Sequence, residues 1–140
     1  MARTGQARPG YLMAQIHTIN DEASLEAVLA ESDTVVIDFW APWCPPCRAF
    51  IPVLERAADQ NPDIAFCRAS MEDSRDLAQA FDVASIPTLV VIRERVMIAS
   101  QAGYLPPEKL ESLLGQVRAL DMDELRREMA AAQGEGGDAQ

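Results

Sequence analysis

Short apolar runs alternate along this chain with segments in which apolar residues recur every three or four positions. Runs rich in β-branched and aromatic residues, such as Thr34 to Trp40, are typical of strands in a buried sheet. The wider spacing predicts helices that bury one face, as along Leu110, Leu114 and Val117. We expect strands at 15–19, 34–40, 64–70, 88–92 and 96–100, and helices that begin near 21, 44, 74 and 106.

The order of these elements is βαβαβαββα, which predicts an α/β domain with helices flanking a central sheet. Strands that alternate with helices pair in parallel, because each helix carries the chain back to the end where the previous strand began. Only Arg93, Glu94 and Arg95 separate the last two strands, so these should form a hairpin and make the sheet mixed. Pro52 should kink the helix over 44–60, because proline lacks a backbone donor.

The two ends of the chain differ in composition from the middle. Residues 1–14 are expected to be a flexible lead, and residues 15–118 the domain. Residues 119–133 predict a short helical extension, which Asp121 would cap and in which Leu125 lies on the apolar face. This extension either packs on its own domain, frays in solvent or docks a partner. Residues 134–140 are expected to be a disordered tail.

The composition excludes several classes of protein. The 140 residues are about enough for one domain, and 49% of them are hydrophobic. A formal net charge of −10 disfavours binding to nucleic acid or to an anionic membrane, since both attract lysine and arginine. We find no export signal or membrane-spanning segment and expect a cytoplasmic protein. Three cysteines are too few for a disulfide scaffold, and in that compartment a cysteine pair is catalytic or metal-binding.

Two cysteines, Cys44 and Cys47, stand where a predicted strand ends and a predicted helix begins. The first turn of a helix presents unpaired N–H groups and the positive end of the helix dipole, which stabilise a thiolate. The sulfur of Cys44 would then be a nucleophile near neutral pH, and a cysteine one turn later can close a disulfide with it. A zinc site is the alternative, but it would have to recruit Cys67 and His17, and we expect no metal.

The segments around this pair resemble the thioredoxin family over residues 15–118. The run from Val36 to Ala41 is similar to the strand that leads into the family's active site, and Trp43-Cys44-Pro45-Pro46-Cys47 is similar to the active site itself. The stretch from Ser85 to Thr88 resembles the family's loop with a cis proline, and Pro52 and Gly103 also fall at family positions. The resemblance implies the thioredoxin fold.

The resemblance also implies roles for individual residues. Cys44 would attack a substrate disulfide, and the more buried Cys47 would attack Cys44 to release the reduced substrate. Asp38, a carboxylate within an apolar strand, would be buried with a raised pKa and would accept the proton of Cys47. The substrate would contact Trp43, Pro45 and Pro46 and pair with the backbone of Ile86 beside Pro87, while Trp40 and Arg68 support the site.

Three positions depart from the family pattern. Pro45-Pro46 replaces the usual Gly-Pro, and neither proline offers an N–H to the Cys44 thiolate. We therefore expect the pKa of the Cys44 thiol to lie near the value of about 7 found in thioredoxin. Arg68 stands where the family commonly has lysine, and we expect it to lower the pKa of Asp38 relative to a lysine partner. Glu94-Arg95 replaces Asn-Gly, so we expect a longer or distorted turn.

The function that the resemblance implies is the reduction of protein disulfides by a monomer without a bound cofactor. Its electrons would come from a flavin-dependent thioredoxin reductase that uses NADPH. Two alternatives stay open. One is an oxidase or isomerase on the same fold, and the other is an interaction or chaperone module that docks clients through the C-terminal helix.

Overall fold

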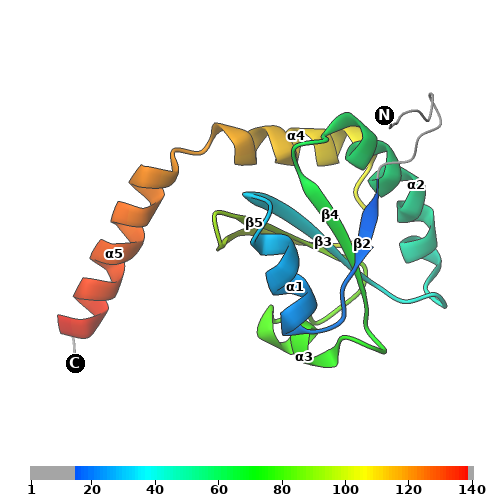
Figure 1. The fold of residues 1–140 in the computed structure, drawn as a ribbon, viewed down its shortest axis with the longest axis horizontal. Coiled ribbons are helices and arrows are strands. Elements are labelled where there is room, and N and C mark those ends of the chain that lie inside the picture. Colours follow the sequence, from blue (N-terminus) through cyan, green and yellow to red (C-terminus); the bar gives the residue numbers. More distant parts are fainter. Residues whose placement is uncertain (1–14, 139–140) are drawn as a thin grey trace.

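The structure is a computed structural model that describes residues 15–138 (Figure 1). Its strands are β2 (Ile16–Thr18), β3 (Thr34–Trp40), β4 (Ala65–Ser70), β5 (Thr88–Arg93) and β6 (Val96–Ala102). Its helices are α1 (Glu22–Leu29), α2 (Pro45–Gln60), α3 (Arg75–Ala80), α4 (Pro107–Ala119) and α5 (Met122–Asp138). This succession confirms the predicted order βαβαβαββα with a helical extension. Residues 1–14, the expected flexible lead, lie outside the described residues.

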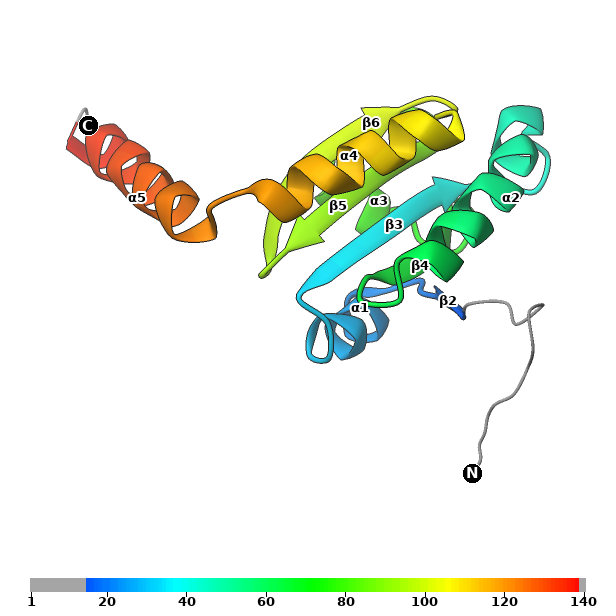
Figure 2. The same ribbon diagram turned by 90° about the horizontal axis from the view of Figure 1, so that it is seen from above.

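The strands form one mixed sheet in the order β2-β4-β3-β5-β6. The central strand, β3, runs parallel to β4 and antiparallel to β5. The expectation of parallel pairing is therefore wrong at β5, because the connection through α3 leaves the chain at the end of the sheet where β4 ended. β2 extends the parallel side, and the β5–β6 hairpin completes the antiparallel side. Helices cover both faces (Figure 2), with α2 and α4 on one and α1 and α3 on the other.

Alternate residues of β3 enter two separate cores. Val36 packs in the core formed with α2 and α4, which also holds Leu54 and Leu114. Ile37 packs on the opposite side, in the core formed with α1 and α3, which also holds Leu77. Residues 35–39 are all buried as a result, and this explains why the strand is apolar at every one of these positions except Asp38 rather than alternately apolar and polar.

The first helix after β3, α2, passes Pro52 without ending. Figures 1 and 2 both show α2 changing direction along its length, as expected where a proline removes one backbone hydrogen bond. The buried side of α2 carries Cys47, Phe50 and Leu54 at helical spacing. The same apolar stripe that fixes α2 on the sheet therefore fixes the position of Cys47.

The prediction of a longer or distorted hairpin turn between β5 and β6 is wrong. β5 and β6 pair up to the residues on either side of it, so the turn consists of Glu94 and Arg95, with φ angles of 51° and 68°. Positive φ at both positions suits the twist of the two strands but strains residues that carry a side chain. Neighbouring groups hold this geometry, since the N–H of Glu94 donates to the carbonyl of Asp33 at 2.7 Å and Arg95 pairs with Glu26.

The side chain of Arg93 joins the hairpin to the end of α4. Its Nη1 donates to the backbone carbonyls of Val117 at 2.9 Å and Leu120 at 3.0 Å. These carbonyls belong to the last turn of a helix and the residue after it; Val117 accepts only one weak backbone bond there, from the N–H of Leu120 at 3.3 Å. Arg93 therefore closes the C-terminal end of α4 from the neighbouring strand.

The helical extension, α5, is capped by Asp121 as predicted, since the N–H of Glu124 donates to the Asp121 carboxylate at 3.0 Å. The helix continues over 134–138, where the sequence predicts a disordered tail, because the alanines before it favour helix and helix propagates readily once formed. Residues 139–140 lie outside the described part. Met122 is buried and Arg126 forms an ion pair with Glu94 of the hairpin turn. Beyond these contacts α5 extends away from the sheet (Figures 1 and 2).

Candidate active site

Cys44 is the N-cap residue of α2, at the end of the loop that leaves β3. The N–H of Cys47 donates to the Cys44 sulfur at 3.3 Å. Pro45 and Pro46 fill the first two helical positions, where a missing N–H group costs no intrahelical bond. The cysteine pair lies at a helix N-terminus as predicted, and within the first three helical positions Cys47 alone can donate a backbone N–H to the sulfur.

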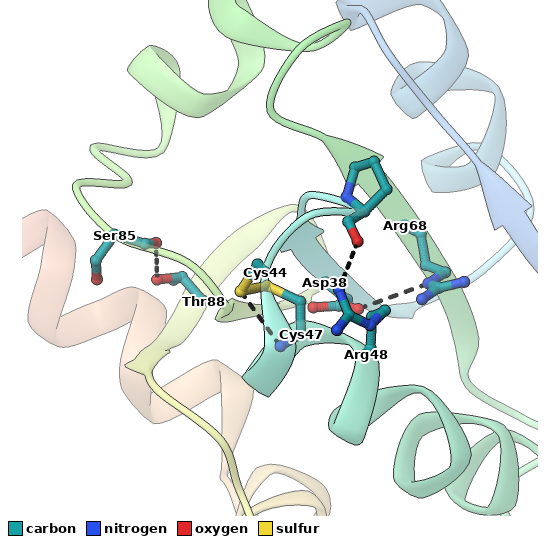
Figure 3. Close-up of a disulfide and its surroundings, with 8 residues drawn as sticks. Asp38, Cys44, Cys47, Arg48, Arg68, Ser85 and Thr88 are labelled. Carbon is teal, nitrogen blue, oxygen red and sulfur yellow. Dashed lines mark hydrogen bonds and ion pairs between the residues drawn. A yellow bond between two sulfur atoms is a disulfide. The ribbon is translucent and has the colours of Figure 1, made fainter.

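A disulfide joins Cys44 and Cys47, whose Cα atoms are 5.2 Å apart (Figure 3). Cys44 is 5% exposed and Cys47 is 0% exposed. Ala41 packs with both cysteines, and the partly buried side chains of Trp40 and Ile86 lie against the cluster. Cys44 is therefore the more exposed of the two residues.

The loop before α2 and the first two residues of that helix form an exposed rim. Trp43 is 63% exposed, and Pro45 and Pro46 are exposed too. The guanidinium of Arg48 donates to the carbonyl of Pro42 at 2.9 Å and so holds this loop (Figure 3). The sequence patterns do not single out Arg48, because an arginine on the outer side of a helix is usually a solvated residue. Its position directly after Cys47 is the one signal that could have pointed to it.

The loop before β5 brings Ile86 and Pro87 to the disulfide. The Ile86–Pro87 bond is cis, as the resemblance implies. The hydroxyl of Thr88 donates to the carbonyl of Ser85 at 2.7 Å, which closes the loop on itself (Figure 3). Because β5 lies next to β3, this loop and the Cys44 loop leave the sheet at neighbouring positions. Contact of Ile86 with the cysteine cluster follows from that adjacency.

Asp38 lies in the middle of β3 and is 0% exposed, which confirms its predicted burial. Neither carboxylate oxygen has a hydrogen-bond partner within the described chain. Burial raises the pKa of Asp38 to about 6, against the opposing effect of the positive charge on Arg68. A carboxyl group with such a pKa can take up and release a proton close to neutral pH. Figure 3 shows Asp38 between the disulfide and Arg68 in projection.

Arg68 is the register partner of Asp38 on β4. Its Nε lies 3.6 Å from Oδ2 of Asp38, an ion pair just beyond hydrogen-bond distance. Its guanidinium carbon lies 4.3 Å from the ring centroid of Trp40, a cation–π contact. One side chain thus contacts both the buried carboxylate and the tryptophan that packs against the cysteines.

The remaining candidates take no part in the site. Cys67 is fully buried in β4, and burial raises the pKa of its thiol to about 12, which disfavours the reactive thiolate. His17 is half-buried in β2. Among the described residues, no three His, Cys, Asp or Glu side chains are grouped so as to hold a metal ion. Within residues 15–138, no helix has both the length and the apolar character needed to cross a bilayer.

Comparison with known proteins agrees with this geometry. Residues 15–116 match the family model described as Thioredoxin. The putative thioredoxin 2 of Streptomyces coelicolor is 45% identical over 114 residues, which cover 81% of this chain and 85% of that protein. The thioredoxin of Haemophilus influenzae is 36% identical over 106 residues, covering 74% of this chain and 98% of that protein.

Solved structures agree as well. A mutant thioredoxin from Halobacterium salinarum superposes with a TM-score of 0.73 at 28% identity, covering 84% of this chain and 99% of that one. The oxidised mitochondrial thioredoxin 3 of Saccharomyces cerevisiae gives a TM-score of 0.67 at 28% identity, covering 72% and 94%. The chain belongs to the thioredoxin family and is a thiol–disulfide oxidoreductase of the protein-disulfide reductase type.

Proposed function

We propose that Cys44 is the attacking nucleophile of this reductase and Cys47 the resolving cysteine. The observation that carries the assignment is the difference in placement of the two sulfurs. Cys44 caps the N-terminus of α2 and has a small exposed area, whereas Cys47 is completely enclosed one turn later. A helix N-terminus favours the thiolate over the thiol, and a partly exposed thiolate is the one that a protein substrate can approach.

The reaction then runs in two exchanges. The Cys44 thiolate attacks one sulfur of a substrate disulfide, the substrate S–S bond breaks, and the first substrate thiolate leaves and takes a proton from solvent. The Cys47 thiol gives up its proton and attacks the Cys44 sulfur of the mixed disulfide, which releases the second substrate thiolate. Two electrons pass to the substrate, and the protein is left with the Cys44–Cys47 disulfide, the state seen in the structure.

Asp38 is the proton acceptor for Cys47 in this scheme, acting through water. Its pKa of about 6 leaves it ionised at neutral pH yet basic enough to hold a proton during the exchange. The enclosed position of Cys47 disfavours an isolated thiolate there, so its deprotonation needs a base in the protein interior. Arg68 and Trp40 support this group from β4 and β3.

The substrate segment lies along the exposed rim of Trp43, Pro45 and Pro46. The backbone of Ile86, next to the cis Pro87, pairs with an extended segment as an added strand would. Support for this placement comes from the contact of Ile86 with the cysteine cluster and from the high exposure of Trp43. An exposed indole beside an uncharged loop favours apolar groups around the target disulfide.

The oxidised protein is returned to the dithiol by a flavin-dependent thioredoxin reductase that uses NADPH. The protein works as a monomer in the cytoplasm and holds no cofactor beyond its redox-active cysteine pair. Support for these assignments comes from family membership and from the bacterial relatives named thioredoxin.

The test is insulin reduction driven by dithiothreitol, with variants of each cysteine. Wild type and Cys67→Ser should reduce insulin equally, because Cys67 is buried away from the pair. Cys44→Ser should be inactive, and Cys47→Ser should accumulate mixed disulfides with substrate proteins under thiol-free conditions. Mixed disulfides that form through Cys47 in the Cys44→Ser protein instead would reverse the assigned order of attack.

The reduction potential separates reductase from oxidase. A value near about −270 mV, as in thioredoxin, supports the reductase, whereas about −120 mV, as in the oxidant DsbA, would indicate an oxidase. Prevention of client aggregation by a protein lacking both cysteines would instead support the chaperone module.

A further inference from the structure

Tyr104 is an exposed aromatic residue on the connection between β6 and α4. Its side chain is 44% exposed, whereas most large apolar side chains of the domain are buried. A tyrosine combines a large apolar ring with a polar hydroxyl, which suits it to contact with another molecule where it lies beside a reactive site. Two sets of contacts show where this ring lies.

The first contact ties the backbone before Tyr104 to the cis-proline loop. The N–H of Gly103 donates to the carbonyl of Pro87 at 2.8 Å. Gly103 has a φ of +94°, a conformation that residues with a side chain rarely adopt. The glycine thus lets the chain turn sharply against Pro87, and it delivers the next residue, Tyr104, to the same end of the sheet as the disulfide.

The second contact ties the ring itself to α2. The Tyr104 ring meets Phe50 edge-on, with centroids 6.0 Å apart and an interplanar angle of 77°. Phe50 is buried and lies three residues after Cys47, one helical turn along. Both views of the ribbon show the N-terminal end of α4 beside α2 (Figures 1 and 2). Phe50 therefore supports one side of the ring and leaves the other side open.

The chain around this ring carries no charge. Residues 39–47, 83–92 and 96–107 contain no Asp, Glu, Lys or Arg, although the whole chain has a formal net charge of −10. These three stretches hold Trp43, the cis-proline loop and Tyr104. Apart from Arg48, whose guanidinium lies at the Pro42 carbonyl, these stretches bring no charge to this end of an acidic molecule. Such surroundings favour a partner segment that is apolar, since bringing an acidic segment close to the molecule would cost electrostatic energy.

We propose that Tyr104 is a specificity-determining residue that, together with Trp43, selects disulfides flanked by apolar or aromatic side chains. The occupant is the extended, disulfide-bearing segment of a substrate protein, because a backbone hydrogen bond joins Gly103, the residue before Tyr104, to Pro87 in the loop proposed to bind that segment. This inference rests on the proposed function of that loop in binding substrate.

The test compares rates of oxidation of the dithiol protein by three disulfides. Two are disulfide-linked dimers of one short peptide, with either tryptophan or serine on both sides of the cysteine, and the third is 2-hydroxyethyl disulfide. The second-order rate constants are measured by acid quench and mass spectrometry. Tyr104→Ser should lower the rate with the tryptophan peptide roughly fivefold, the effect of losing about 1 kcal/mol of aromatic contact, and leave the other two rates unchanged.

Two variants serve as controls. Tyr104→Phe keeps the ring and should keep the wild-type preference. Met97→Ser removes a side chain that is 50% exposed on β6, the strand that leads to Tyr104, but at its other end next to the hairpin turn, and it should change none of the rates. An equal loss with all three disulfides in Tyr104→Ser, or an unchanged preference for the tryptophan peptide, would overturn the proposal. Failure of wild type to react with 2-hydroxyethyl disulfide would instead overturn the proposed function.

Discussion

The guanidinium of Arg68 covers the ring of Trp40 at 4.3 Å while its Nε faces the Asp38 carboxylate. Asp38 and Trp40 are two residues apart on β3 and so point to the same face of the sheet, where Arg68 reaches both from β4. A planar, permanently charged group suits this double contact, since it can stack on an indole and face a carboxylate together. Arg68 thus couples the proton acceptor to the packing around the cysteines.

Replacing Arg68 should change the titration of Asp38. Arg68→Met removes the positive charge that opposes the effect of burial, so the pKa of Asp38 should rise further above about 6. Arg68→Lys keeps a charge but loses the planar stack, and the pKa should rise by less. The pKa values are measured from the NMR chemical shifts of carboxyl carbons in isotopically labelled protein as the pH is changed. The Asp38 signal is assigned by its absence in Asp38→Asn. An identical Asp38 titration in wild type and Arg68→Met would contradict the coupling.

Asp38 should make the oxidised protein less stable as pH rises. Its pKa is about 6 in the folded protein against 3.8 as the ordinary value, so between these values the folded protein holds a proton that the unfolded chain has released. The free energy of unfolding therefore falls as pH rises from about 4 to about 6 and stays about 3 kcal/mol lower above that range.

Asp38→Asn should remove this pH dependence. At pH values above the folded pKa the variant should be more stable than wild type, and the two should converge at acidic pH, where wild-type Asp38 is protonated too. Urea unfolding at a series of pH values measures the difference. Asp123→Asn, at an exposed position on α5, is the control and should follow wild type. A constant gap at all pH values would show that burial of the charge is not its cause.

Pro46→Ala should lower the pKa of the Cys44 thiol. An alanine at the second helical position supplies an N–H group that can donate to the N-cap sulfur, which now accepts from Cys47. A hydrogen bond to a charged group lowers the pKa by about one unit, and the stabilised thiolate makes the protein more oxidising. Ultraviolet absorbance of the thiolate follows the titration.

Pro45→Ala is the matched control for this change. The N–H at the first helical position is not the one that an N-cap side chain accepts from, so the Cys44 pKa should move little. Equal shifts in the two variants would show that flexibility of the turn, rather than a new hydrogen bond, controls the thiolate.

Arg93→Met should destabilise the domain without affecting the chemistry. The substitution removes the side-chain donor of the Val117 and Leu120 carbonyls, at a cost of about 1 kcal/mol for each hydrogen bond. Arg95→Met, which removes only an exposed ion pair with Glu26, should cost less. Thermal unfolding measures both, and insulin reduction should proceed at the wild-type rate below the transition. Equal losses of stability would argue against closure of α4 by Arg93.

The sequence predicts the sheet and the reactive pair well because the signals there are local. A buried central strand is a continuous apolar run, and two prolines after Cys44 mark the first turn of a helix. The hairpin turn was harder, since its geometry depends on Asp33 and Glu26, which are remote in sequence from Glu94 and Arg95. The preferences of residues for particular turns do not include such contacts with distant residues.

Tertiary contacts also decide the parts of the site that local patterns miss. The bond from Arg48 to Pro42 and the stack of Arg68 on Trp40 join residues whose side chains follow no periodic pattern. The end of α5 differs for another reason, because helix propagation outlasts the point where the apolar stripe ends. The spacing of apolar residues predicts a helix only where that helix packs against the rest of the protein, so it does not predict the part of α5 that lies beyond its last apolar residue.

The central position of β3 in the sheet also determines how the active site is disrupted when the protein unfolds. This strand has hydrogen-bonded neighbours on both sides and helices over both faces, and the loop to Cys44 leaves from its end. Backbone amides in such a strand exchange with solvent only when the whole domain opens. Hydrogen exchange in residues 35–39 should therefore be the slowest in the chain, and catalytic activity should disappear with global unfolding rather than through any earlier local opening.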